Sequence, residues 1–307
     1  MNSQNMDKMG GEIVERQNLE ENLRLLAAQR QLYDKAKIVF FWQIFLTTIM
    51  ITILSVANLF SNIEWLLASY SVLITLIDLM ILKELIQKSK VAAATIQEEF
   101  DVKVLDIDWN GLIPKVLPER VFRFSEKYKK KEPDYKNLQN WYSPKLKELD
   151  TAVSKIICQR SNCVYDFSLR ESFTRLLMGF MILAIILVIT FALIKGLTID
   201  NFFQLLVLPI LPMITFSVQK YQDNRASISA LTDLKDSSEE VWKKVLTNKS
   251  VDIEKSSRLI QDRIFANRKK SPLIFNWFYN RARSKLESEM HFSVEQLVIA
   301  YKKSVSL

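Results

Sequence analysis

The chain alternates between long apolar segments and long charged ones. The apolar segments cover residues 38–60, 65–82, 176–194 and 202–218. Each is close to the ~20 residues that an α-helix needs to cross a hydrocarbon core, and the last is the shortest. Short links with few positive charges join the first segment to the second and the third to the fourth. The pattern therefore predicts four transmembrane helices arranged as two hairpins.

The charged segments are also predicted to be helical. Apolar residues recur there at spacings of three and four, and the chain holds only 5 glycines and 7 prolines, the residues that most often end helices. One segment departs from this pattern. DVKVLDIDW at 101–109 alternates loosely, which predicts a minor β-strand or an extended segment near 102–107. The predicted fold class is an all-α membrane protein with four transmembrane helices and long cytoplasmic helical extensions.

These patterns divide the chain into five parts. Two transmembrane hairpins separate three parts that are predicted to lie in the cytoplasm and to be mostly helical. In chain order, the parts are a cytoplasmic N-terminal helix (1–37), the first hairpin (38–82), a cytoplasmic middle segment (83–172), the second hairpin (173–218) and cytoplasmic C-terminal helices (219–307).

The distribution of positive charge predicts the orientation of the chain in the membrane. Residues 1–37, 83–172 and 220–307 hold 6, 17 and 17 of the 42 lysines and arginines. Segments rich in lysine and arginine stay on the cytoplasmic side of a membrane. We therefore expect a multi-pass membrane protein with both termini in the cytoplasm. Only the two short links would face outward, which argues against a receptor for an external ligand.

The net charge and the small numbers of cysteine and histidine limit which nucleic-acid, membrane and metal partners are expected. A net charge of +8 and a pI near 9.3 suit either a nucleic-acid footprint or basic flanks of membrane helices. Because membrane segments are present, the second interpretation is favoured, and no DNA or RNA partner is predicted. The 2 cysteines and 1 histidine are too few for a structural zinc site built from these residues alone. No metal and no cofactor are expected.

The sequence contains no recognisable catalytic motif. It has no dinucleotide-binding glycine pattern, phosphate-binding loop, zinc-protease motif or serine-hydrolase elbow. Cys158 could be a reactive thiolate near Arg160, but a small buried residue is the favoured interpretation. His291 is interpreted as a surface or packing histidine, and the adjacent Glu98 and Glu99 as part of a solvated helix face. The protein is therefore not expected to be an enzyme.

Two polar residues lie inside the predicted membrane segments. Asp78 is near the end of the second, and Gln204 is in the fourth, which also contains Pro209 and Pro212. An ionisable residue in a span either pairs locally or faces a pore or another subunit, and for Asp78 both interpretations stay open. Prolines kink a helix and free backbone carbonyls, so the fourth segment suits a helix that moves or lines a pore.

A set of arginines and aromatic residues near the membrane forms the candidate ligand site. Arginine binds phosphate, and aromatic rings stack on bases. The same residues could instead hold helices together through ion pairs, and residues alone favour this structural interpretation. Those on the first helix share one face, and the others lie ahead of the third span. The candidates are Arg30, Tyr33, Lys37, Trp141, Arg160 and Arg170.

Five motifs in a fixed order give the chain a family resemblance. They are RQNLEENLRLLAAQRQLYDKAK at 16–37, FDVKVLDIDWN at 100–110, NWYSP at 140–144, ICQRSNCVYDFSLR at 157–170 and LIQDRIFANRKKSPLIFNWFYNRAR at 259–283. Together they resemble the SMODS-associated four-transmembrane family of bacterial cyclic-oligonucleotide (CBASS-type) anti-phage systems. The resemblance covers nearly the whole chain.

This resemblance implies a pore-forming membrane effector. Such an effector would be activated by a cyclic nucleotide made by a nucleotidyltransferase encoded nearby, and would impair the inner membrane and arrest the infected cell. No ligand residues are transferred from the family, so the candidate site depends on the residues alone. Two hairpins are too few to enclose a wide aqueous path, so a homo-oligomer in the lipid bilayer is expected. The alternative is a membrane-anchored scaffold or sensor that recruits a cytosolic partner and forms no pore.

Overall fold

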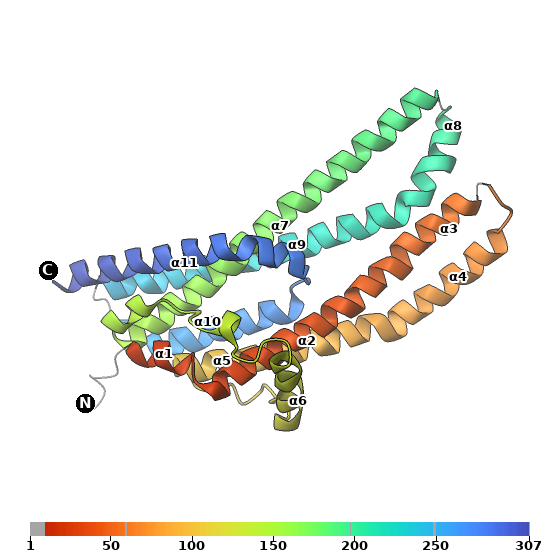
Figure 1. The fold of residues 1–307 in the computed structure, drawn as a ribbon. Coiled ribbons are helices and arrows are strands. Elements are labelled where there is room, and N and C mark those ends of the chain that lie inside the picture. Colours follow the sequence, from red (N-terminus) through yellow and green to blue (C-terminus); the bar gives the residue numbers. More distant parts are fainter. Residues whose placement is uncertain (1–9, 59, 197, 248–249, 307) are drawn as a thin grey trace.

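The computed structural model describes all residues except 1–9, 59, 197, 248–249 and 307. These described residues form helices, turns and irregular segments, and no strand occurs among them. Figure 1 shows a helical bundle from which two helical hairpins project in the same general direction. The first described helix, α1 (Gly11–Arg16), and the end of the last, α11 (Asn276–Val305), both lie toward the opposite end of the bundle.

The first hairpin is built from helices that run without a break out of the bundle. The N-terminal helix α1 (Gly11–Arg16) precedes them and packs on the bundle. The outgoing arm is α2 (Glu20–Ile44), the π-helical turn η1 (Phe45–Ile49) and α3 (Met50–Asn58). The returning arm is α4 (Glu64–Ile77), a second π-helical turn η2 (Asp78–Leu82) and α5 (Lys83–Leu105).

The second hairpin has the same design. Its outgoing arm is the single helix α7 (Thr151–Lys195), which ends at Gly196 in the left-handed conformation that glycine adopts without strain. Its returning arm is α8 (Ile199–Phe202), η5 (Phe203–Val207) and α9 (Leu208–Leu246). The remaining elements belong to the bundle: α6 (Pro118–Lys129), η3 (Lys136–Leu138), η4 (Pro144–Glu148), α10 (Ile253–Lys270) and α11 (Asn276–Val305).

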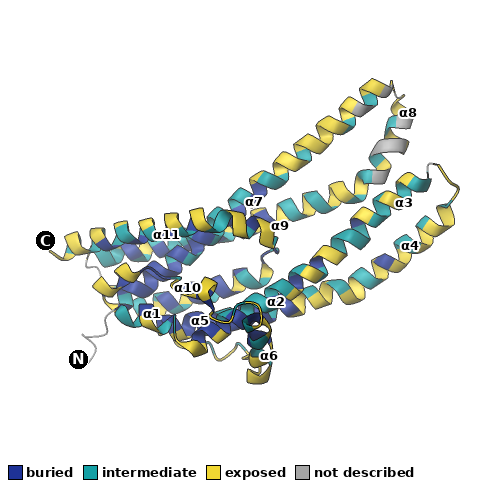
Figure 2. Cartoon of the chain, in the orientation of Figure 1, coloured by how far each residue is buried: buried dark blue, intermediate teal, exposed yellow. Residues whose placement is uncertain are grey.

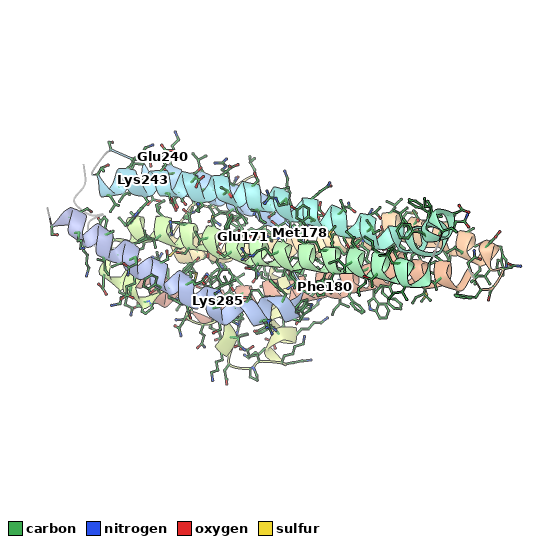
Figure 3. The ribbon with its side chains drawn as sticks, turned by 90° about the horizontal axis from the view of Figure 1, so that it is seen from above. Glu171, Met178, Phe180, Glu240, Lys243 and Lys285 are labelled. Atoms are coloured by element: carbon green, nitrogen blue, oxygen red, sulfur yellow. The ribbon has the colours of Figure 1, made fainter. Side chains whose placement is uncertain are left out.

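Burial divides the molecule in the way that the apolar and charged segments predict. Figure 2 shows that much of both hairpins is exposed. Many of the exposed residues there are large and apolar, and Phe180 on α7 is 57% exposed. Figure 3 places Phe180 and Met178 along the hairpin, whereas Glu240, Lys243 and Lys285 lie on the bundle. Exposed apolar surface of this extent is normal for a protein that contacts lipid.

Within the described residues, three helices are long and apolar enough to cross a membrane. They are Glu20–Asn58, Glu64–Leu105 and Thr151–Ile194. The first contains most of the predicted span 38–60, and the other two contain the predicted spans 65–82 and 176–194. The structure thus confirms the all-α class and three candidate spans. The fourth span, at 202–218, is helical and contains Pro212 inside α9, but its ability to cross the membrane stays a prediction.

The predicted β element near 102–107 is wrong. Helix α5 continues to Leu105 and ends at Asp106, which adopts the left-handed conformation. The loose alternation arose because Val102, Val104 and Leu105 are all buried, so the end of this helix contacts the protein on more than one side. A helix buried on several sides loses the one-sided apolar pattern that identifies it from sequence.

The main hydrophobic core lies where α2, α5, α7 and α11 meet inside the bundle. Leu32, Ile96 and Ile157 are almost completely buried, and Val294 from α11 belongs to the same cluster of buried side chains. Three of these four helices, α2, α5 and α7, continue from the core into the hairpins. A shift of the bundle ends of these helices relative to one another would move the hairpins.

Candidate functional site

A cavity of about 280 Å³ lies in the bundle near the start of the hairpins. It is lined by α2, α5, α7 and α9, which all continue into hairpin arms, and by α10, α11 and the segment 137–141. Five of the six candidate ligand residues line this one cavity, although they come from distant parts of the sequence. They are Arg30, Tyr33, Lys37, Trp141 and Arg170.

Helix α2 presents a row of side chains to the cavity. Arg30, Tyr33 and Lys37 follow each other at spacings of three and four, which places them on one helix face. The guanidinium of Arg30 lies 4.7 Å from the centre of the Tyr279 ring and donates a 3.2 Å hydrogen bond to its hydroxyl. Lys37 Nζ donates to the side-chain oxygen of Asn276 at 2.5 Å. Both cationic side chains therefore form hydrogen bonds with residues of α11.

Helix α7 and the preceding loop form the facing wall. Trp141 donates through its ring nitrogen to Asn162 at 3.0 Å, and its ring meets that of Tyr165 edge-on at 4.9 Å. Arg170 donates to Asp166 at 3.1 Å and to the carbonyl oxygen of Pro272 at 3.1 Å. Each polar head group thus has a defined position before any ligand arrives.

Helix α11 contributes residues that the sequence-based candidate set missed. Tyr279, Arg283, Glu287 and His291 all line the cavity. They are spaced four residues apart, so they form one stripe along the helix, and this spacing is the signal that could have identified them. Arg283 donates to Glu287 at 2.6 Å and to the carbonyl oxygen of Asn137 at 2.8 Å.

Positive charge exceeds negative charge in the cavity lining, which suits an anion. Among the described lining residues, the carboxylates are Asp101, Asp166 and Glu287. The opposing cations are Arg30, Lys37, Arg170, Arg268 and Arg283.

Burial also changes the acid–base behaviour of the cavity. Desolvation lowers the pKa of Lys37 to about 8, partly offset by nearby Asp34. Desolvation likewise raises the pKa of the Tyr33 phenol to about 12. The Lys37 amine therefore loses its proton far more easily than an exposed lysine does, and a bound anion would favour the protonated form.

Arg160, the sixth candidate, does not line the cavity. It donates to Glu239 on α9 at 2.9 Å and to Ser293 on α11 at 3.2 Å. These contacts join three helices of the bundle, so the geometry supports the structural interpretation for this arginine.

A buried polar network lies beside the cavity, and it contradicts one expectation from the sequence. Glu98 is not on a solvated face: it is completely buried and accepts from Arg258 at 2.6 Å and from Gln261 at 2.7 Å. The neighbouring Asp101 accepts from Gln261 at 3.1 Å and from Arg268. This network joins α5 to α10.

The polar residues of the predicted spans pair locally. Asp78 accepts a 2.6 Å hydrogen bond from Gln43 and lies 3.4 Å from Lys83, all within the first hairpin. Gln204 donates to Asp200 at 3.4 Å, one turn away on the same arm. Asp78 and Gln204 each lie in a π-helical turn, which often marks a functional segment of a helix. A pore-facing or inter-subunit role for either residue stays a prediction.

The thiols do not form a reactive site. Cys158 and Cys163 are free and buried, and desolvation raises the pKa of both, that of Cys163 to about 12. A neutral buried thiol is a poor nucleophile. No group of His, Cys, Asp and Glu side chains in the described part of the chain is arranged to hold a metal ion.

Comparison with known proteins places the chain among bacterial effectors. The family model for the SMODS-associating 4TM effector domain matches residues 11–297. A protein of Bacillus cereus (strain VD146), named as a probable CBASS effector molecule, is 30% identical over 289 residues. That alignment covers 91% of this chain and 95% of the relative. No solved structure matches this chain.

Proposed function

Because this chain belongs to the family of SMODS-associating 4TM effector domains, we propose that it is a membrane effector of anti-phage defence switched on by a cyclic nucleotide. The single observation that carries the proposal is the cationic cavity lined by all four helices that enter the hairpins. A ligand there would contact the bundle end of every hairpin arm directly. No long relay through the protein is then needed.

The cavity offers the two kinds of contact that a cyclic nucleotide requires. Arg30, Lys37 and Arg170 would bind its phosphates, and the rings of Trp141 and Tyr279 would stack on its bases. A volume of about 280 Å³ is just below the roughly 300–1,000 Å³ of typical ligand pockets. The cavity is therefore small for a cyclic dinucleotide, which carries two bases, two sugars and two phosphates. Binding would therefore force the lining helices apart, and this displacement is the proposed trigger.

The output of the switch is damage to the inner membrane. The bundle and both termini would lie in the cytoplasm, where a nucleotidyltransferase encoded nearby would release the signal. Several copies of the chain would assemble in the bilayer, because two hairpins cannot by themselves enclose a wide aqueous path. Loss of the membrane barrier would arrest growth or kill the infected cell, as in abortive infection.

Dye release from liposomes tests this function. The full chain is reconstituted into vesicles with entrapped fluorophore and exposed to a panel of cyclic dinucleotides and trinucleotides. We expect one of them to cause release, whereas the matching linear dinucleotide does not. Calorimetric titration of the detergent-solubilised protein should show binding of the same compound. Binding without release would instead favour the membrane-anchored scaffold that recruits a cytosolic partner.

The affinity of the site should depend on pH through Lys37. Below pH 8 this amine is already protonated, whereas above pH 8 the ligand must bind together with a proton. The affinity should therefore fall above pH 8, approaching tenfold per pH unit. Titrations at pH 7, 8 and 9 would measure it. The Lys37→Arg variant stays charged across this range and should give the flatter profile, so identical profiles for the two proteins would contradict the assignment.

A further inference from the structure

The linker between α10 and α11 covers the residues 271–275, Ser-Pro-Leu-Ile-Phe. Pro272 has no backbone N–H and forces the preceding residue into an extended conformation, so α10 ends at Lys270. The linker then runs extended until α11 begins at Asn276. Ser271, Leu273 and Ile274 are buried, which is unusual for a connection between two helices.

Polar groups from three hairpin arms hold the linker backbone and its first side chain. Lys90 on α5 donates to the carbonyl oxygens of Lys270 and Ser271 at 3.3 and 3.2 Å. The guanidinium of Arg170 on α7 donates to the carbonyl oxygen of Pro272. The hydroxyl of Ser227 on α9 lies 2.7 Å from the hydroxyl of Ser271. Each arm thus satisfies a group that a mobile linker would leave to water.

Apolar contacts join the linker to the fourth arm as well. The ring of Phe275 stacks on Phe40 of α2 at 5.6 Å and meets Phe173 of α7 edge-on at 6.5 Å. Leu273 is buried in a cluster with Phe40, against which Phe216 of α9 also packs. The linker therefore contacts α2, α5, α7 and α9 together, at the level where these helices leave the bundle.

We propose that this linker is an autoinhibitory clamp that holds the four hairpin arms in the resting arrangement. Withdrawing it would remove one element that contacts all of α2, α5, α7 and α9 at this level. Its link to a signal rests on the proposed function, because Pro272, Leu273 and Ile274 also line the cavity. A ligand that recruits Arg170 would take it from the Pro272 carbonyl and loosen the clamp.

The clamp predicts that a weakened linker opens the membrane without any nucleotide. Phe275→Ala removes both ring contacts, and dye release from nucleotide-free liposomes should rise roughly tenfold or more over the wild type. The matched control is Phe292→Ala, the same truncation on α11 at a ring that is 64% exposed, which should release no more dye than the wild type. Circular dichroism and size-exclusion chromatography establish that both variants are folded.

A second variant keeps the test decisive if Phe275→Ala does not fold. Lys90→Met leaves the packing volume nearly unchanged but removes the donor to the linker carbonyls, and it should also leak without nucleotide. If a folded Phe275→Ala or Lys90→Met variant releases no more dye than the Phe292→Ala variant, the clamp hypothesis is wrong. If these variants release dye while no cyclic nucleotide causes release from wild-type liposomes, the clamp hypothesis is supported and the hypothesis of activation by a cyclic nucleotide is wrong.

A cysteine pair tests the movement of the linker itself. The hydroxyls of Ser227 and Ser271 are close enough for a disulfide to replace them in a Ser227→Cys/Ser271→Cys variant. In the Lys90→Met background, oxidation should stop the leak and dithiothreitol should restore it. The native Cys158 and Cys163 are buried and free, so they should not interfere. A leak that persists when the pair is oxidised would show that the arms open with the linker in place.

Discussion

Replacing Arg268 by methionine should lower the melting temperature by roughly 10 °C, because it leaves a buried carboxylate without its cation. Asp101, the partner of Arg268, is almost completely buried, and Glu98 lies one turn away on α5. Truncating one member of a buried ion pair typically costs about 3 to 5 kcal/mol. Burial also raises the pKa of the Glu98 carboxyl, so an unpaired Asp101 carboxylate beside it would add to the cost of burying charge on α5.

A matched variant shows whether the fall in melting temperature comes from the buried ion pair or from the loss of any arginine on this helix. Arg263→Met changes the same residue type on the same helix, where the side chain is exposed and donates a hydrogen bond to the hydroxyl of Ser237. It should shift the melting temperature by no more than about 2 °C. Adding Asp101→Asn to Arg268→Met should recover much of the loss, because the buried site is then neutral. Equal melting temperatures for Arg268→Met and Arg263→Met would contradict the proposed role of the pair.

The network around this pair explains why a polar interior is retained next to the cavity. Gln261 donates to both carboxylates, and Gln159 on α7 donates to Gln261 at 3.1 Å and to the carbonyl oxygen of Ser257 at 2.8 Å. The network therefore fixes α10 against two hairpin arms, α5 and α7. Since α10 leads directly into the linker, this fixed helix determines where the linker begins.

The sequence predicted the membrane-directed helices better than the bundle. Segments such as 176–194 carry no charge and are long enough to cross a membrane, and the structure places them in long apolar helices. These two features are readable from sequence because contact with lipid requires them of each helix separately. Inside the bundle, burial depends on partners from elsewhere in the chain. Glu98 looks like a solvated carboxylate until Arg258 and Gln261, more than a hundred residues away, are placed beside it.

The candidate site was predicted best where one helix face carried the signal. Arg30, Tyr33 and Lys37 share a face by their spacing alone, and the structure places them in one cavity. Arg160 and Arg170 were selected together because both precede the third span. Ten residues along a helix correspond to a turn of about 80° between their directions, so one faces the cavity and the other faces α9 and α11.

Arg30→Ala and Arg160→Ala should therefore have opposite effects. Loss of Arg30 should weaken cyclic-nucleotide binding roughly 30-fold or more, as expected when a charged contact to a ligand is truncated at a cost of about 2 kcal/mol. Its melting temperature should stay near that of the wild type, because its hydrogen bond to Tyr279 joins only α2 and α11, whereas Arg160 joins three helices. Loss of Arg160 should lower the melting temperature and leave the affinity of the folded fraction unchanged.

Both variants are measured by titration with the active nucleotide and by thermal unfolding of the same preparation. Arg30→Lys keeps the charge but loses the planar group that lies on the Tyr279 ring, so it should bind with intermediate affinity. If Arg160→Ala loses binding at an unchanged melting temperature, the ligand contacts α7 on the face toward Glu239, and the cavity is not the site. If Arg30→Ala unfolds instead, Arg30 serves mainly to hold α2 against α11. The pair of results thus separates recognition of the signal from the contacts that keep the bundle together.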